Sequence, residues 1–564
     1  MIFDELRAIQ RQHGYLPADE LKSLSKSSGI PLYHLQGVAS FYPHFYLQPP
    51  ARVNMRVCAD MSCHLRGAVS LCKALKQRFP MAGKDTVAVQ ETSCLGQCDG
   101  APAISINDVI YREVTALGAE GLAQSALEGS LSPPPPARPS ATRLASDPYE
   151  DGARYGALRR FIATRDWEGV LKQLKESGLV GLGGAGFPAG TKWEIVRHTV
   201  SAEKYVVCNA DESEPGTIKD RFILSNLPHL VVEGMILAGV VTGAQRGYLY
   251  IRHEYSAQEK AVQKEIQGCY REGLAGSRIL GSELAFDLEV FVSPGGYICG
   301  EESALLEAME GKRAEPRNKP PFPVTHGLWN KPTVLNNVET FANVPQILSR
   351  GVAWYKSQGR GGCAGLKFVG VSGHVRHPGV FEIPMGTPAR EVIMQQAGGI
   401  LDSRQMKAFA PSGPSSGYLP AAQADVPLDF KSLAAIGSML GSGAIVVCAE
   451  GTCMLDMALN STKFFRNESC GKCVPCRLGS EKMVEILSGW TEGKGAAPDF
   501  QLVDDITHAL KTASICGLGQ FAHMPITSIL AHFRDEVEAH VFQRRCPEGV
   551  CPMRESPLEE RRPL

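Results

Sequence analysis

Three observations in the sequence predict a multidomain α/β protein. At 564 residues the chain is too long for one core, and typical domain sizes suggest about three or four domains. The proline-rich segment SLSPPPPARPSATRLASD, at 130–147, has no pattern able to pack and separates a first part, 1–129, from a larger second part. That second part begins with helical and strand patterns threaded by glycine-rich loops, which indicates an α/β unit to about residue 350.

The other elements follow from local periodicity. The first part opens with two helical patterns, ELRAIQRQHG and ADELKSLSKSSG, and continues into a strand-rich run around RVNMRVC. The stretch LKFVGVSGHVRHPGVFEIPMGT, at 366–387, alternates as strands do and breaks at Gly and Pro. After about residue 445 the pattern becomes helical and ends in HFRDEVEAHVFQRR, at 532–545.

Composition narrows the class of protein. The net charge of −1 gives no reason to expect a nucleic acid or an anionic membrane as a partner. The N-terminus MIFDELRAIQRQ carries no apolar signal, and the apolar stretch at 230–244 is interrupted by Glu233 and too short to span a bilayer. We therefore expect a cytoplasmic protein without membrane insertion. In that setting its 17 cysteines are metal ligands and reduced thiols.

Four cysteines in the first part form two close pairs. Cys58 and Cys63 lie in a C-x4-C pattern, and Cys94 and Cys98 lie in a C-x3-C pattern. Two pairs of thiolates suit the two irons of a [2Fe–2S] cluster, with one pair for each iron. A zinc site or buried free thiols is the alternative, because zinc pairs have gaps of two to four residues.

A second cysteine set lies in SCGKCVPCRLG, at 469–479. Cys470, Cys473 and Cys476 stand at two-residue gaps, and Cys516 in SICGLGQ is the best candidate for a fourth ligand. Three neighbouring cysteines and one distant cysteine can bind the four irons of a [4Fe–4S] cubane. A bare CxxC redox pair would explain neither the third thiol nor Pro475 between them.

A glycine-rich loop indicates a phosphate site. GLGGAGFPAGTKWE, at 181–194, has five glycines in its first ten residues, and Lys192 follows them within the same stretch. Glycines allow backbone N–H groups to approach a phosphate closely, and a following helix adds its positive end. Alone, such a loop is as often a turn as a nucleotide site, and it fits neither the Rossmann nor the Walker pattern.

Three further stretches strengthen that prediction. CNADESEPGTIKDR, at 208–221, crowds acidic residues just after the strand-like KYVV. YICGEESA, at 297–304, is a second glycine–acid loop, and VLNNVET, at 334–340, has paired asparagines able to hydrogen-bond a planar heterocycle. Each could be a solvated loop or turn, but together they predict a ligand site at the ends of α/β strands.

These motifs carry a resemblance to a known family. GLGGAGFPAGTKW, NADESEPGTIKDR, PGGYICGEE, RNKPPFP, LNNVET, SGHVRHPGVFEIPMGT and ESCGKCVPC with SICGLG resemble the FMN- and NADH-binding flavoprotein subunit of respiratory complex I and its soluble relatives. The first part, with its C-x4-C and C-x3-C, resembles the thioredoxin-like [2Fe–2S] subunit usually found beside it. Fusion of the two resembles the diaphorase parts of soluble NAD-dependent formate dehydrogenases and NAD-reducing hydrogenases.

The resemblance implies a division into domains. These are a thioredoxin-like [2Fe–2S] module (1–129), the proline-rich linker (130–147), an FMN/NADH-binding α/β domain (148–355), a β-grasp domain (356–444), a helical bundle with the [4Fe–4S] cluster (445–545) and a C-terminal tail (546–564).

The resemblance also implies site residues. The FMN site falls on ten residues: Gly183, Gly184, Lys192, Asn209, Asp211, Glu212, Gly300, Glu301, Asn336 and Asn337. The NADH site falls on Glu214, Glu302 and Lys319, with Phe187 and Phe322 placed to sandwich the adenine. Glu214, near the nicotinamide, is expected to tune charge and positioning. Many relatives read Arg-Gly-Arg before the paired glycines, where this chain has Val180 and Leu182, and Ile195 replaces a third aromatic.

The implied function is electron transfer between NAD(H) and iron–sulfur clusters through FMN. The leading hypothesis is the beta subunit of an NAD-dependent formate dehydrogenase, with formate oxidised on a separate molybdenum or tungsten subunit that carries further clusters. The alternatives are the diaphorase subunit of an NAD-reducing hydrogenase, a complex I-type NADH dehydrogenase flavoprotein, and a redox scaffold that has lost nucleotide binding.

The C-terminal sequence suggests a third metal site. EAHVFQRRCPEGVC, at 538–551, supplies His540, Cys546 and Cys551 as three possible zinc ligands, with Cys453 as a fourth. The alternative is a tail that caps a partner subunit and keeps its thiols free.

Overall fold

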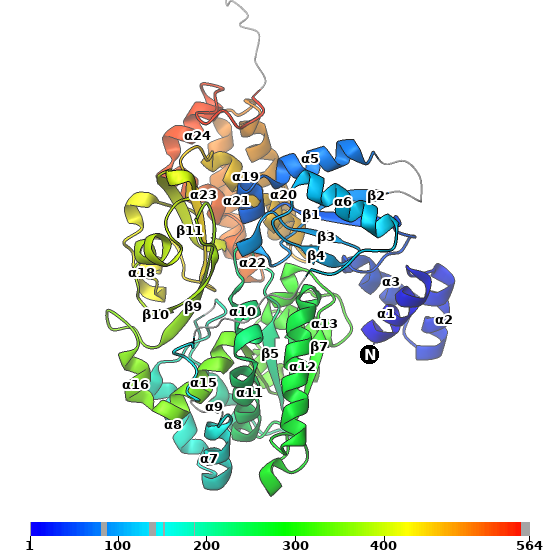
Figure 1. The fold of residues 1–564 in the computed structure, drawn as a ribbon, viewed down its shortest axis with the longest axis vertical. Helices are drawn as coiled ribbons and strands as arrows, with labels where there is room; N and C mark the ends of the chain where they lie inside the picture. Colours follow the sequence, from blue (N-terminus) through cyan, green and yellow to red (C-terminus); the bar gives the residue numbers. More distant parts are fainter. Residues whose placement is uncertain (1, 81–86, 135–142, 150–152, 185, 554–564) are drawn as a thin grey trace, which may run out of the picture.

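The computed structural model describes residues 2–80, 87–134, 143–149, 153–184 and 186–553. It contains three β-sheets and a C-terminal group of helices, so the predicted multidomain α/β class is confirmed (Figure 1). The glycine-rich loop, the acidic loop and both cysteine sets lie where these units meet.

The chain opens with three helices: α1 (Ile2–His13), α2 (Ala18–Ser28) and α3 (Leu32–Phe41). The first two confirm the helical patterns at the N-terminus. These helices pack on the central α/β unit, because the Arg7 guanidinium donates to the carbonyl of Val292 at 2.7 Å and the Tyr42 hydroxyl donates to that of Lys312 at 2.6 Å.

The next unit is a four-stranded sheet in the order β2-β1-β3-β4, in which β1 pairs parallel with β2 and antiparallel with β3. The strand predicted around RVNMRVC is β1. Its bounds and those of its neighbours are β1 (Val53–Cys58), α4 (Met61–Leu65), α5 (Ala68–Arg78), β2 (Val87–Thr92), β3 (Ile104–Ile106), β4 (Val109–Tyr111) and α6 (Ala116–Leu127).

The central unit is a parallel sheet in the order β7-β6-β5-β8. Alternate residues of β5 face two different cores: Val206 packs with the helices that follow the strands, and Val207 packs with the N-terminal helices. Because β5 is buried on both faces, the three residues YVV of the strand-like KYVV are all apolar instead of alternating with polar residues. The strands are β5 (Tyr205–Ala210), β6 (Arg246–Ile251), β7 (Asp287–Val292) and β8 (Thr333–Asn337).

Helices cover both faces of this sheet (Figure 1). The most deeply buried is α11 (Pro228–Thr242), which packs against α15 (Val338–Arg350). The others are α7 (Gly156–Thr164), α8 (Trp167–Ser177), α9 (Ala189–His198), α10 (Lys219–Asn226), α12 (Ser256–Arg271), α13 (Glu302–Met309), α14 (Pro323–His326) and α16 (Val352–Ser357).

A five-stranded mixed sheet follows, in the order β10-β9-β13-β11-β12. β9 and β13 are the first and last strands of this sheet along the chain, yet they lie next to each other at its centre and run parallel. The remaining pairs are antiparallel, which is the β-grasp arrangement. Since β13 ends at Ala449, this sheet extends past the boundary predicted at 444. The elements are β9 (Leu366–Gly373), β10 (Gly379–Pro384), α17 (Ala389–Glu391), a π-helical turn (Val392–Gln396), β11 (Met406–Pro414), β12 (Leu419–Pro420), α18 (Phe430–Ala435) and β13 (Ala444–Ala449).

The predicted linker is only partly within the described residues, since 135–142 lie outside them. Its end packs on the β-grasp sheet: the backbone N–H groups of Ala145 and Ser146 donate to the Glu382 carboxylate at 2.6 and 2.8 Å. Sequence reasoning expected no packing here, because a small polar segment has no apolar periodicity that could reveal it.

The C-terminal helices form a bundle above the β-grasp sheet and the central unit (Figure 1). They are α19 (Met454–Glu468), α20 (Val474–Thr491), α21 (Pro498–Ala513), α22 (Gly517–Phe521), α23 (Met524–His532) and α24 (Arg534–Val541). The helical pattern predicted to end in 532–545 corresponds here to α24, and Phe533, at φ −134° and ψ 34°, separates α23 from α24.

No single helix among the described residues is both long and apolar enough to cross a membrane. Only α10 and α11 taken together meet that test, and they are bent by 93°.

A buried carboxyl makes the stability of the central unit sensitive to pH. Glu233, in the middle of α11, is fully buried. It accepts hydrogen bonds from the Tyr149 hydroxyl at 2.7 Å and from the Leu158 backbone N–H at 2.9 Å. Burial raises the pKa of Glu233 to about 7, above its ordinary value of 4.5. The folded state therefore holds this proton more tightly than the unfolded state, and stability falls as pH rises from about 4.5 through 7.

We predict that Glu233→Gln, which mimics the protonated form, removes this loss. The shift corresponds to about 3 kcal/mol, so the thermal midpoint of the variant should rise relative to wild type between pH 5 and pH 8. Calorimetry on both proteins measures it, with the exposed Glu168→Gln in α8 as control. Parallel pH profiles for wild type and Glu233→Gln would contradict the prediction.

Candidate cofactor and cluster sites

The glycine-rich loop lies between α8 and α9, at the carboxyl end of β8. A Cβ atom at Gly183 would approach the Asn337 Cβ to 2.8 Å, and Gly184 has a φ of +141°. Both positions therefore require glycine. The loop is closed by a hydrogen bond of 2.8 Å from the Gly181 N–H to the Phe187 carbonyl. Such a backbone cradle at the strand ends fits the phosphate of a nucleotide cofactor.

Val180 and Leu182, which stand at the two positions where arginine was expected from the resemblance, both have structural contacts in this loop. Leu182 is buried in the core, and its backbone N–H donates to the Thr340 hydroxyl at 2.9 Å. Val180 forms a β-bridge with Pro188. Near the loop, Lys192 in the first turn of α9 donates to the Leu335 carbonyl at 2.8 Å, which holds its cation beside the end of β8.

The acidic loop after β5 is held by its own carboxylates. Asp211 accepts from the Ser213 hydroxyl at 2.5 Å and the Ser293 hydroxyl at 2.8 Å. Burial raises the pKa of Asp211 to about 6. Glu212 accepts from the backbone N–H groups of Asp220 at 2.7 Å and Arg221 at 3.0 Å, so it caps the start of α10. The buried Glu212 carboxylate thus holds the acidic loop against the start of α10.

The asparagines join strand ends to neighbouring loops. Asn209 donates to the Gly300 carbonyl at 2.8 Å. Asn337 donates to Asp220 at 2.6 Å and caps α15. With its amide oriented to satisfy both neighbours, Asn336 donates to the Leu335 carbonyl at 3.0 Å and accepts from the Trp193 indole N–H at 2.9 Å. Asn336 and Asn337 therefore both have protein partners.

The residues expected on the NADH side also lie together. Lys319 bridges Glu301 at 2.9 Å and Glu302 at 2.7 Å. Glu301 also caps α13 through the N–H groups of Ser303 and Ala304. The expected adenine-stacking residues, Phe187 and Phe322, are 45% and 51% exposed. Large exposed aromatic rings beside the predicted phosphate-binding loop suit a nucleotide ring that must bind and leave.

Glu214 lies where the β-grasp domain meets the acidic loop. Its carboxylate accepts from the Ser415 N–H at 3.2 Å. A Cβ at Gly413, whose φ is +59°, would lie 2.4 Å from the Pro215 carbonyl oxygen, so only glycine permits this close approach. Burial raises the pKa of Glu214 to about 7.

Sequence reasoning missed a buried ionic network beside the same loops. Lys219, fully buried in α10, contacts Asp220 at 2.6 Å, Glu339 at 3.1 Å and the Asn337 amide oxygen at 2.9 Å. Glu339 also pairs with Lys367 of β9, whose pKa burial lowers to about 8. The available signal was charge inside otherwise apolar segments, such as Lys367 in the fully buried β9.

The first cysteine set converges. Cys58 ends β1, Cys63 lies in α4, and Cys94 and Cys98 lie on the loop after β2; all four are buried. The Cys94 and Cys98 sulfurs are 3.5 Å apart, and the Cys58 thiol has both Cys63 and Cys94 as neighbours. The Gly96 N–H donates to the Cys94 sulfur at 3.4 Å. Four convergent thiols with amide donors to sulfur fit an iron–sulfur cluster.

Two buried arginines attach this cysteine loop to the acidic loop. Arg252 donates to the Cys94 carbonyl at 2.7 Å and to the Glu212 carbonyl at 2.6 Å. Arg221 donates to the Gly96 carbonyl at 2.8 Å. In addition, the Gly216 N–H donates to the Cys98 sulfur at 3.2 Å. The [2Fe–2S] cysteines therefore lie directly against the loop expected to surround the flavin.

The second cysteine set lines one apolar cavity, which contains all of Cys470, Cys473, Cys476 and Cys516. Cys473 is the N-cap of the long helix α20, whose positive end stabilises thiolates and a negatively charged cluster. Pro475 occupies the first turn of α20, where no backbone donor is needed. The structure thus brings the distant Cys516 to the CxxCxxC triplet, as the sequence predicted.

A cleft of about 1230 Å³ runs between the first module and the rest of the chain. Its walls include Cys94 of the first cysteine set and Cys470 of the second, together with Tyr297 and Glu468. Both cluster loops therefore border one open space.

Comparison with known families agrees with this arrangement. Four family models match: a thioredoxin-like [2Fe–2S] ferredoxin over residues 1–126, a Nuo51 FMN-binding domain over 174–346, an SLBB domain over 368–418, and the NADH-ubiquinone oxidoreductase-F iron–sulfur binding region over 456–540.

Individual relatives cover most of the chain. The F 2 subunit of NADH-quinone oxidoreductase in Rhizobium meliloti is 44% identical over 399 residues, which is 71% of this chain and 95% of that protein. The HndC subunit of the NADP-reducing hydrogenase in Solidesulfovibrio fructosivorans is 44% identical over 69% of this chain and 82% of that protein. A chain of an NAD⁺-reducing [NiFe]-hydrogenase, solved in the H₂-reduced state, matches with a TM-score of 0.84 and 31% identity, covering 95% of this chain and 93% of that one.

The fold and the cluster sites thus define an NADH-binding flavin and iron–sulfur electron-transfer protein. The chain belongs to the family of the NADH-quinone oxidoreductase F subunits and their hydrogenase counterparts, fused to a thioredoxin-like [2Fe–2S] domain. The predicted FMN, NAD(H), [2Fe–2S] and [4Fe–4S] cofactors are confirmed at the level of these domains. The assignment of individual residues to each cofactor stays a prediction.

We predict that the two cysteine sets hold separate clusters. A chain with one [2Fe–2S] and one [4Fe–4S] cluster contains about six irons. Cys516→Ala should lower the iron content to about two per chain, and Cys98→Ala should lower it to about four. Iron analysis with EPR of the reduced protein measures both.

The matched control is Cys363→Ala, a partly exposed thiol outside both sets. It should retain all the iron. Full iron content in either Cys516→Ala or Cys98→Ala would remove that cysteine from its ligand set.

Proposed function

We propose that this chain is the beta subunit of an NAD-dependent formate dehydrogenase, in which it passes electrons between NAD⁺ and the clusters of a separate formate-oxidising subunit. The observation that carries the proposal is the intact [2Fe–2S] cysteine set in the fused module. All four thiols converge and lie against the flavin loop. The proposed partner is a molybdenum or tungsten subunit with further iron–sulfur clusters, in the cytoplasm.

In this proposal the protein's contribution is binding and orientation. FMN, when bound, supplies the conversion between a two-electron hydride and single electrons. The amides of Gly183 and Gly184 and the Lys192 cation would hold its phosphate. Asn209 and Asp211, fixed by Gly300 and Ser293, would help to orient the flavin.

The dinucleotide side has its own set of residues. Phe187 and Phe322 would stack on the adenine, and Glu302 with Lys319 would offer a paired acceptor and donor to polar groups of the nucleotide. Glu214, held by Ser415, borders the nicotinamide end. No side chain of this set is expected to act as a general acid or base, because FMN and NAD(H), when bound, would supply hydride chemistry of their own.

A second candidate is the diaphorase subunit of an NAD-reducing hydrogenase. The observation that favours it is the structural match to a chain of an NAD⁺-reducing [NiFe]-hydrogenase over 95% of this chain. The NADH-quinone oxidoreductase relatives favour a complex I-type NADH dehydrogenase flavoprotein in the same way. All three share the NADH-handling half of the reaction and differ in the partner.

We predict that formate reduces the natively purified complex. Under anaerobic conditions, formate should bleach the flavin and cluster absorbance, and metal analysis should find molybdenum or tungsten. Bleaching by hydrogen, with nickel present, would instead identify a hydrogenase. Bleaching by NADH alone, in an intact complex that responds to neither substrate, would contradict both assignments and leave a complex I-type partner.

We also predict a pH dependence that arises from Glu214. Because the pKa of Glu214 is raised to about 7, its carboxyl is neutral below pH 7 and ionised above it. The ionised form repels the NADH diphosphate, so the KM for NADH should rise about twofold to threefold between pH 6 and pH 8. Glu214→Gln should abolish this rise in NADH oxidation with an artificial acceptor.

The exposed Glu203→Gln serves as the control and should keep the wild-type profile. If Glu214→Gln shows the same rise in KM as wild type, another group is responsible.

A further inference from the structure

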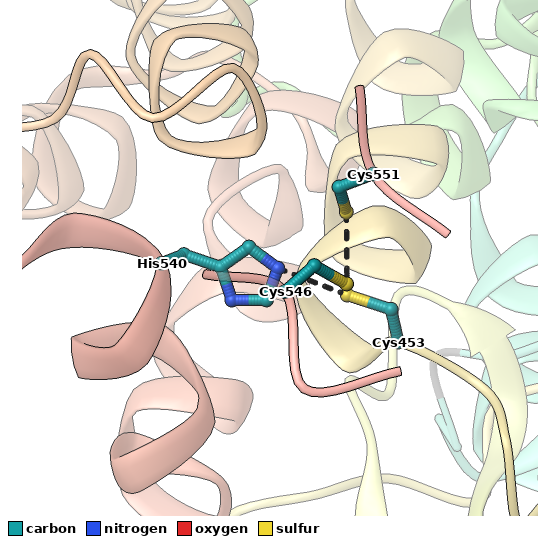
Figure 2. A group of neighbouring side chains, drawn as sticks. All are labelled: Cys453, His540, Cys546 and Cys551. Atoms are coloured by element: carbon teal, nitrogen blue, oxygen red, sulfur yellow. Dashed lines mark hydrogen bonds between the residues drawn. The ribbon is translucent and has the colours of Figure 1, made fainter. Parts of the chain in front are cut away.

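Four side chains outside the flavin and cluster sites converge at the C-terminal end of the chain. They are Cys453, His540, Cys546 and Cys551, and their ligand atoms all lie within 4.8 Å of one another (Figure 2). The chain brings them from three places: the start of α19, the last turn of α24 and the segment after α24. Nothing in the electron-transfer function uses these residues.

Their spacing matches a single tetrahedral ion. The Cys453 sulfur is 3.6 Å from the Cys551 sulfur and 3.4 Å from the His540 Nε2. A tetrahedral zinc with the usual bond lengths separates two sulfurs by about 3.8 Å and a sulfur from a nitrogen by about 3.6 Å. In an iron–sulfur cluster only the ligands of one iron lie this close, and the ligands of different irons lie farther apart because bridging sulfides separate the irons. Here all four ligand atoms lie within 4.8 Å of one another, which fits the ligands of a single ion. Three thiols with one imidazole also cannot all pair as disulfides.

The imidazole is oriented for ligation. Its Nδ1 lies 2.7 Å from the Glu536 carbonyl oxygen, which it can reach only as a donor. The proton is then on Nδ1, and the lone pair of Nε2 points toward the three sulfurs (Figure 2). A backbone carbonyl in this position is the usual outer partner of a metal-binding histidine.

A second layer of contacts fixes the elements that carry the ligands. The Glu536 carboxylate accepts from the Met454 N–H at 2.7 Å, next to Cys453. Lys407 of β11 pairs with Glu536 at 2.9 Å and with Glu548 at 2.7 Å. Glu548 lies between Cys546 and Cys551, so one lysine ties the β-grasp sheet to both α24 and the tail.

The pocket is closed to solvent on most sides. His540 is fully buried, Cys453 is 1% exposed and Cys546 is 8% exposed. A turn joins the two tail cysteines, with the Gly549 N–H donating to the Cys546 carbonyl at 3.1 Å and Gly549 at φ +67°. Four protein ligands leave no position open for water or substrate, which is typical of a structural rather than a catalytic zinc site.

We propose that Cys453, His540, Cys546 and Cys551 bind one structural Zn²⁺ ion. The ion carries no electrons; it fastens the C-terminal segment to α19 and α24 and so braces the helical bundle that carries the second cysteine set. Binding releases the thiol protons of the cysteines, and no oxidation or reduction is involved.

The test is metal analysis of the purified full-length protein. Wild type and the Cys363→Ala control should each contain about one zinc per chain. Cys551→Ala and His540→Ala should each lose at least about four fifths of that zinc while keeping the wild-type iron content. Cys551 is the partly exposed tail ligand, so its replacement disturbs the core least.

A second measurement needs no variant. Zinc K-edge absorption on the wild-type protein should show three sulfur ligands at about 2.3 Å and one nitrogen ligand at about 2.0 Å. Wild-type protein without zinc, or with one extra iron in its place, would overturn the proposal. So would a zinc ion whose ligand shell is mainly oxygen, or zinc that persists at full content in Cys551→Ala and His540→Ala.

Discussion

The arrangement of this protein depends on the contact between the first cysteine loop and the acidic loop after β5. Arg252 donates to a carbonyl in each loop, at Cys94 and Glu212, and is itself buried. Loss of that guanidinium would leave two buried carbonyls without donors, and buried charged networks that lose one partner typically cost about 3–5 kcal/mol. The two loops, which are predicted to serve different cofactors, are thus joined through one buried side chain.

Several of the residues predicted to bind a cofactor or a metal lie at the ends of helices and strands. Cys58 ends β1, Cys473 precedes α20, Cys453 precedes α19 and Asn337 joins β8 to α15. The end of a helix or strand has backbone donors without partners inside that element, and the element fixes the direction of the chain. A side chain at such an end is joined to regular structure on at least one side, so its position is well defined. Because of this placement, the packing of these helices and strands also positions the residues of the predicted cluster, flavin and zinc sites.

The β-grasp domain connects these sites to one another. Gly413, at the end of β11, closes on the acidic loop, and Lys407, at the other end of the same strand, holds α24 and the tail. Lys367 of β9 pairs with Glu339 in the first turn of α15, beside the predicted FMN site. A single sheet therefore contacts both the predicted nucleotide side and the proposed zinc side.

Local spacing in the sequence determined a large part of this protein. The C-x4-C, C-x3-C and CxxCxxC patterns predicted the two iron–sulfur clusters, and the glycine loop and the acidic loop predicted a ligand site at strand ends. FMN and NAD(H) followed from the family resemblance that these motifs carry. The strands at 366–387 and the helical N-terminus also agreed with local periodicity, because side-chain patterns repeat with the period of the element.

Only the tertiary structure decided which distant residues meet. It placed Cys516 beside the triplet and Cys453 beside the tail ligands, two residues that the sequence had named only as candidates. It also brought Arg221 and Arg252 to the first cysteine loop, which the sequence had not indicated at all. It also showed that Glu212 caps α10 and that Asn336 is hydrogen-bonded to Trp193. From the sequence, both residues were expected only to contact FMN. The physical reason is that side-chain orientation and burial depend on packing between units, and residue spacing along the chain carries no information about that packing.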